Sequence, residues 1–240
     1  MFFKLQFLPS KFEFLKEHFG EVQNGFQQKI EKAAQKEVSV EKEFIRVIET
    51  PAVETSWLIN SSILRPQEAI SVAEMTKASR GNLLYRATRD KFTAKSFHSK
   101  CDGKKNTLTI VKTNTNFVFG GYTSAKWASD RNYKEDSTAF ICSLRRNGVS
   151  QKRKFNIKKP QYAILGLPSY GPIFGSGTGS DINDFYICDS SHTDYGSMAN
   201  IGNSYECPEG YKFGNKDTSS YLTGSSNRWL TTEIEVYEIN

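Results

Sequence analysis

The chain of 240 residues is 38% hydrophobic and 24% charged, and it contains 17 Phe, 11 Tyr and 3 Trp. This composition excludes a wholly disordered chain, and the lack of an apolar run of about 18 residues indicates no membrane insertion. The net charge of +6 is unevenly distributed along the chain. Residues 145–159 carry seven basic and no acidic side chains, whereas residues 160–240 carry ten acidic and three basic ones. This distribution is not typical of a protein that binds nucleic acid through a uniformly basic face.

The start of the chain is apolar but interrupted by Lys4, Gln6 and Pro9, so we expect no signal peptide. The four cysteines form no CxxC pair and are too sparse for a disulfide framework. Reduced thiols of this kind are typical of a cytoplasmic protein.

Residues 1–56 differ from the rest of the chain. Apolar residues recur three or four apart from Phe12 to Ala33 and again from Val40 to Val47, which predicts a long amphipathic helix that ends at Thr50-Pro51. We interpret residues 1–56 as a coiled-coil arm and linker. Its apolar stripe needs a surface to pack against, and we consider two alternatives: self-association through residues 12–47, or docking on the following domain.

After residue 60, short helical segments alternate with β-type segments. Pro66 suits a first helical turn, which predicts a helix from Pro66 to Ala78. Asp90 is predicted to cap a second helix that continues to about Ser99.

Alternating and β-branched runs then predict several short strands. These strands lie at residues 83–87, 107–111, 117–119, 139–144, 163–165, 185–187 and 233–237. Many short strands with a few short helices predict an α+β domain over residues 61–240, built as a two-sheet antiparallel β-sandwich edged by helices.

Taken in order, several segments resemble the TLDc domain family. They are LLYRATRD at 83–90, FHSKCDG at 97–103, TLTI at 107–110, FGGYT at 119–123, YKED at 133–136, GPIFG at 171–175, DFYI at 184–187, NSY at 203–205, LTGS at 222–225 and EIEVY at 233–237. Each segment alone is weakly specific, whereas the ordered series over residues 61–240 is specific.

The resemblance implies a compact two-sheet sandwich and a role in oxidation resistance. For several family members it also implies binding to the vacuolar-type proton ATPase and control of its assembly. Family members share no established catalytic mechanism, and the N-terminal helix resembles the coiled-coil arm that joins this domain to other modules.

The motifs that could carry chemistry are weak. The glycine-rich segment at 175–179 lacks the Lys-Ser/Thr of a phosphate loop and is followed by Asp181 and Asp184, so we expect a turn and no cofactor. Three histidines without ligand spacing predict no metal site. Cys101, close to His98, Lys100 and Lys104, is the best candidate for a thiol-dependent antioxidant enzyme, which we keep as the alternative function.

Charged segments supply the candidate interaction residues. Glu233 and Glu235 alternate with apolar residues on the last strand and are expected on an exposed sheet face. The basic segment is expected to be a loop that contacts an acidic partner, and it supplies the candidates Arg145, Arg146, Lys152, Arg153 and Lys154. RNA is the weaker partner because base-stacking aromatics do not alternate with these residues.

These patterns favour a non-enzymatic adaptor or regulator in the cytoplasm. We expect it to bind subunits of the vacuolar-type proton ATPase and to reach organelle membranes through that protein partner.

Overall fold

The computed structural model describes residues 24–25, 27–36, 56–58, 60–177, 183–226 and 229–240. The chain divides into two compact units, Met1–Ala52 and Val53–Asn240. In the first unit, residues 24–25 and 27–36 are helical and exposed. Most of the predicted amphipathic stripe lies outside the described residues, so self-association through residues 12–47 stays a prediction.

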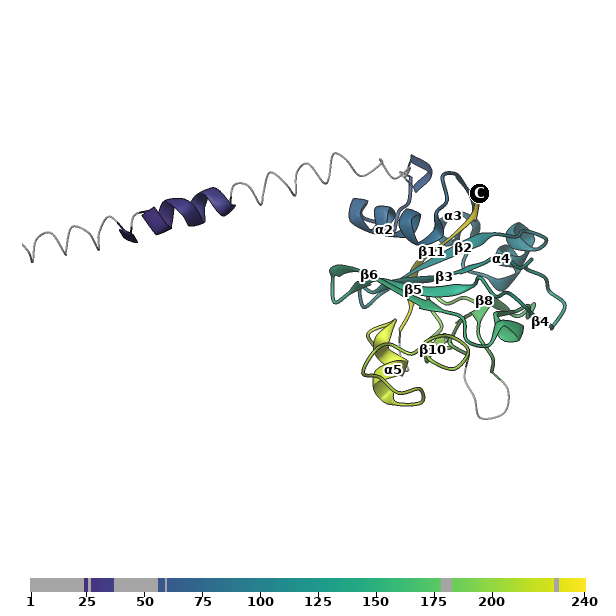
Figure 1. The fold of residues 1–240 in the computed structure, drawn as a ribbon. Helices are drawn as coiled ribbons and strands as arrows, with labels where there is room; N and C mark the ends of the chain where they lie inside the picture. Colours follow the sequence, from purple (N-terminus) through teal and green to yellow (C-terminus); the bar gives the residue numbers. More distant parts are fainter. Residues whose placement is uncertain (1–23, 26, 37–55, 59, 178–182, 227–228) are drawn as a thin grey trace, which may run out of the picture. The chain divides into compact units, whose positions relative to one another are not determined.

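The second unit contains two antiparallel sheets (Figure 1). The six-stranded sheet has the order β1 (Gly81–Arg86), β11 (Thr231–Ile239), β2 (Thr107–Thr113), β3 (Val118–Thr123), β5 (Phe140–Arg146) and β6 (Val149–Asn156). The five-stranded sheet has the order β10 (Met198–Ala199), β9 (Phe185–Cys188), β8 (Tyr170–Phe174), β7 (Ile164–Leu165) and β4 (Tyr133–Lys134). The predicted α+β sandwich is therefore confirmed.

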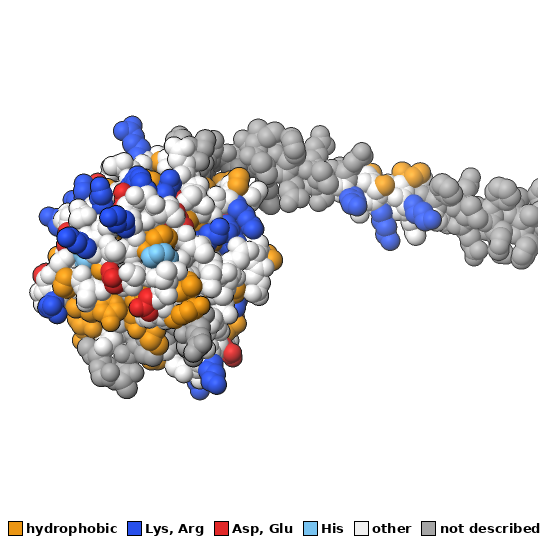
Figure 2. Space-filling view, turned by 180° about the vertical axis from the view of Figure 1, so that it is seen from behind, with side chains coloured by type: hydrophobic (Ala, Val, Ile, Leu, Met, Phe, Trp, Pro, Cys, Tyr) orange, Lys and Arg blue, Asp and Glu red, His pale blue; other side chains and the backbone are white. Residues whose placement is uncertain are grey.

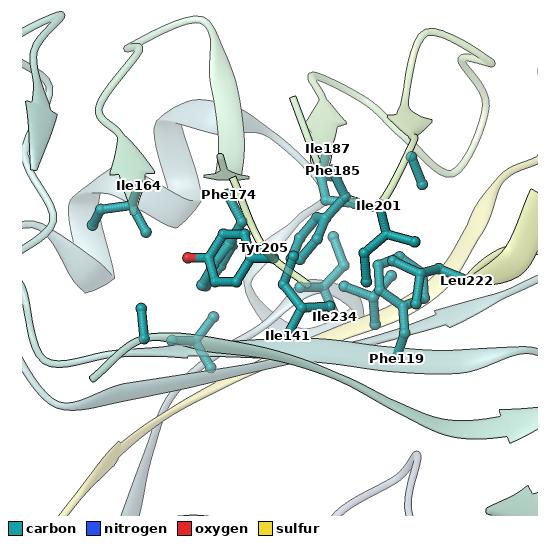
Figure 3. Close-up of a cluster of buried hydrophobic side chains, with 14 of the residues drawn as sticks. Phe119, Ile141, Ile164, Phe174, Phe185, Ile187, Ile201, Tyr205, Leu222 and Ile234 are labelled. Atoms are coloured by element: carbon teal, nitrogen blue, oxygen red, sulfur yellow. The ribbon is translucent and has the colours of Figure 1, made fainter. Parts of the chain in front are cut away.

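Aromatic and branched side chains fill the space between the two sheets (Figure 3). Phe119 of β3 meets Phe185 of β9 edge to face with 5.2 Å between ring centroids, and Phe174 of β8 stacks on Phe185 at 4.7 Å. Gly121 allows the close approach of the sheets, because a Cβ there would lie 2.5 Å from the Phe174 ring. The close approach of the two sheets at this point thus requires a position without a side chain.

Helix α2 (Pro66–Thr76) covers the other face of the six-stranded sheet. Its Val72 and Met75 belong to a second buried cluster that includes Phe140, Cys142 and Leu144 of β5. Alternate residues of β5 share this face because successive strand side chains point to opposite sides. The larger sheet is therefore covered on both faces, which explains why its central strands are almost wholly buried.

The remaining helices are short: η1 (Ser56–Leu58), α3 (Ala87–Asp90), α4 (Ala94–Cys101), η2 (Pro160–Tyr162) and α5 (Lys216–Tyr221). The predicted helix from Asp90 to Ser99 is wrong in its first part. Lys91 adopts a φ of 81°, which ends α3, and Thr93 caps α4 by accepting the N–H of Ser96. The predicted helix at Pro66 is confirmed, although it ends at Thr76 because Lys77 is left-handed with φ 57°.

Candidate interaction surface

The basic segment predicted as a loop is a β-hairpin. Strand β5 ends at Arg146, Asn147 and Gly148 make the turn with φ values of 49° and 78°, and β6 continues through Asn156. The structure corrects the expectation because Asn-Gly is the favoured two-residue hairpin turn between paired strands. Strand alternation then sends neighbouring basic side chains to opposite faces of the sheet.

Arg145 is a structural residue rather than a surface contact. It is 3% exposed, and its Nη2 and Nε donate to the Glu68 carboxylate of α2 at 2.5 and 2.8 Å. Burial opposes the charge of Glu68, yet hydrogen bonds from Arg145, Arg65 and Ser150 hold the pKa of this carboxyl below its usual value. Arg145 therefore binds α2 to the sheet and is not available to a partner.

Lys152 and Lys154 of β6 also lie on the α2 side. Lys152 pairs with Glu74 of α2 at 2.5 Å. The Nζ of Lys154 lies 4.2 Å from the centroid of the Phe140 ring and donates to the carbonyl of Met75 at 3.3 Å. Both ammonium groups thus have intramolecular partners.

Arg146 and Arg153 lie on the opposite side of the hairpin and line a groove of about 730 Å³, here called the β6 groove. One wall is β6, and the other comprises residues 206–211 and Tyr221 of α5. The guanidinium of Arg146 lies 4.1 Å from the centroid of the Tyr221 ring, and its Nε is buried with no acceptor among the described residues. The side chain of Arg153 is exposed and makes no hydrogen bond or ion pair within the described part of the chain.

The wall formed by residues 206–211 is anchored at its first residue and through the segment that precedes it. Glu206 donates its N–H to the carbonyl of Asn156 at 2.9 Å and accepts the Asn156 N–H at 2.9 Å through its carboxylate. Residues 202–205 lie directly before Glu206 in sequence, and their N–H groups donate to the buried Asp184 carboxylate at 2.8 to 3.3 Å. The beginning of this groove wall is therefore fixed by hydrogen bonds to its backbone.

Glu233 and Glu235 are buried, and the expectation of an exposed face is wrong. Glu235 is 0% exposed and accepts hydrogen bonds from Ser61, Ser62 and the Arg86 side chain at 2.6 to 3.0 Å. Glu233 is 6% exposed and accepts the N–H of Thr88 at 3.0 Å. Both carboxylates attach segments at residues 60–62 and 86–88 to β11, so their charge is used within the fold.

Cys101 is the last residue of α4 and is 0% exposed. Burial raises the pKa of its thiol, and the carboxylates of Asp102 and Asp90 raise it further, while Lys104 opposes this. A helix C-terminus also disfavours a thiolate. The cations that lie near Cys101 in sequence therefore do not offset the burial that raises the pKa of its thiol.

Several groove residues were not found by sequence reasoning. Tyr211 and Tyr221 stack edge to face at 5.0 Å, and Tyr221 lies under Arg146. Because they are far from β6 in sequence, no spacing could have placed them there. Lys158, also in the groove, belongs to the basic segment, and its Nζ donates to the carbonyl of Gly202 at 2.8 Å.

Lys and Arg side chains stand in several separate positions on the face in Figure 2, with hydrophobic side chains between them. That view shows no uniformly basic face. None of the described helices is long and apolar enough to span a bilayer. Within the described residues, no three His, Cys, Asp or Glu side chains are grouped to hold a metal ion.

Comparison with known proteins identifies one family. The family model described as the TLDc domain matches residues 55–240. None of the curated proteins matches the chain. The matched residues begin at the segment that precedes α2 and extend to the end of β11, so they include both sheets and the β6 groove.

Proposed function

The chain belongs to the TLDc domain family, and on that premise we propose that it is a non-enzymatic adaptor or regulator with a role in oxidation resistance. Its partner is a large cytosolic assembly, in the first place the vacuolar-type proton ATPase. It acts in the cytoplasm and reaches organelle membranes through that partner.

The observation that carries this proposal is the β6 groove. Its two arginines have hydrogen-bonding capacity that the fold does not use, whereas Arg145, Glu233 and Glu235 are fully engaged in holding the fold together. Arginine and tyrosine at a rigid surface are typical of protein–protein contacts. The surface therefore suits recognition of another protein.

The rival proposal is an antioxidant enzyme that uses Cys101. A thiol nucleophile needs a lowered pKa and access to peroxide, and Cys101 has a raised pKa and no exposed surface. Peroxide consumption by the pure protein, compared with its Cys101→Ser variant, tests this rival. Consumption that depends on Cys101 would replace the adaptor proposal.

The proposed function is tested by affinity capture of the tagged full chain from cytosol and from organelle membranes, with bound proteins identified by mass spectrometry. Proton ATPase activity is measured in parallel with and without added chain. We expect ATPase subunits in the captured material and a changed rate. Capture without these subunits, together with an unchanged rate, would refute the ATPase as partner.

A further inference from the structure

Strand β6 is an edge of the six-stranded sheet with an unpaired outer side. It is the last strand in the sheet order, and among the described strands it pairs only with β5 over residues 149–156. Within the described part of the chain, no backbone group of residues 149–155 hydrogen-bonds to backbone outside β5. The outward N–H and C=O groups of these residues can therefore pair with an added strand.

The basic side chains of this hairpin divide between its two faces. Lys152 and Lys154 have partners on the α2 side, whereas Arg146 and Arg153 face the β6 groove without an acidic partner. A strand added to β6 would send every second side chain toward the groove. Those side chains would meet two guanidinium groups and the Tyr211 and Tyr221 wall.

The basic charge of β6 determines which kind of partner strand could pair with its edge. A second copy of β6 would bring Lys152, Arg153 and Lys154 against like charges, which disfavours pairing of the chain with itself. A nucleic acid would need an exposed aromatic ring on which its bases could stack, and Tyr221, at 5% exposed, does not offer one.

We propose that β6 binds an extended acidic segment of a partner protein by strand addition, with acidic side chains at every second position directed to Arg146 and Arg153. The backbone contacts provide affinity, and the alternating carboxylates provide specificity. Glu206 pairs with the backbone of Asn156 and so limits the added strand to the part of β6 before that residue. This inference rests on the proposed role as a binding protein, but not on the identity of the assembly.

The test uses the full chain and a short fluorescent peptide of alternating Glu and Val, titrated by fluorescence anisotropy. We expect saturable binding, weaker binding in high salt, and about tenfold loss of affinity in Arg153→Glu. Lys95→Glu is the matched control, because Lys95 is exposed on α4 and makes the same charge change away from the groove. It should bind the peptide as the unaltered chain does.

Two further peptides separate strand addition from simple charge attraction. A peptide of the same composition with its Glu residues clustered, and the alternating peptide N-methylated at every second residue, should each bind several-fold more weakly. Equal binding of either peptide, equal loss in Arg153→Glu and Lys95→Glu, or tighter binding of poly(U) RNA would overturn the proposal. Peptide binding without captured ATPase subunits would retain this inference and reject only the proposed assembly.

Discussion

Replacing Arg145 by Met should destabilise the domain by about 3–5 kcal/mol, because the change leaves the Glu68 carboxylate buried without its cation. The structure indicates the lower end of that range. Glu68 is 0% exposed and loses both guanidinium bonds, but it retains the N–H of Arg65 at 2.9 Å and the hydroxyl of Ser150 at 2.6 Å. We therefore expect a loss of about 3 kcal/mol in the free energy of unfolding.

Urea unfolding followed by the fluorescence of the buried Trp127 and Trp229 measures this change. The double variant Glu68→Leu with Arg145→Met should recover much of the lost stability, since a buried pair replaced by apolar side chains leaves no unpaired charge. Lys152→Met is the control, because its pair with Glu74 is 49% and 41% exposed and should cost at most about 1 kcal/mol.

An Arg145→Met variant no less stable than Lys152→Met would refute the assignment of Arg145 as the residue that binds α2 to the sheet. A double variant less stable than Arg145→Met alone would also contradict it, because the two side chains would then act independently.

Three further predictions concern the core, a hydrogen-bonded carboxylate and the thiols. Gly121→Ala should lower the urea midpoint by an amount equivalent to about 1–3 kcal/mol, because its Cβ would lie 2.5 Å from the Phe174 ring; an unchanged midpoint would contradict the close packing of the sheets. Burial opposes the charge of Asp136, but hydrogen bonds from Thr and Ser groups hold its pKa below the usual value, so its stabilising contribution is present above about pH 4 and is lost as the pH falls further. Thermal melting of Asp136→Asn should accordingly show a smaller loss of stability on acidification than the unaltered chain shows. If the melting temperatures of the two proteins fell equally with pH, this role of Asp136 would be rejected. A thiol reagent should modify the half-buried Cys207 well before Cys101, and mass spectrometry that finds Cys101 modified first would be inconsistent with its burial.

Alternation along single strands was readable from the sequence, and it placed most of the strands, including the one at residues 139–144. The partners of charged residues were not readable in this way. Arg145 pairs with Glu68 at a separation of 77 residues, and Glu235 bonds to Ser62 at a separation of 173. Local patterns report which side of an element a residue occupies, but not what a distant segment places against it.

The candidate surface shows the same limit. Residues 145–159 were predicted as one basic loop, yet strand pairing divides them between two faces and buries Arg145. The turn at Asn147-Gly148 was the local signal that favoured a hairpin over a loop. Tyr211 and Tyr221 joined the groove only through tertiary packing, which no short motif records.

The position of β11 in the larger sheet has a consequence for biosynthesis. This strand, Thr231–Ile239, lies between β1 and β2 and pairs with both. Until it leaves the ribosome, β1 has no neighbour in the sheet, and β2 lacks the partner on one side. Closure of the sheet therefore cannot precede the synthesis of β11, so the exposed edges of β1 and β2 during translation are a stage at which chaperones would act on this chain.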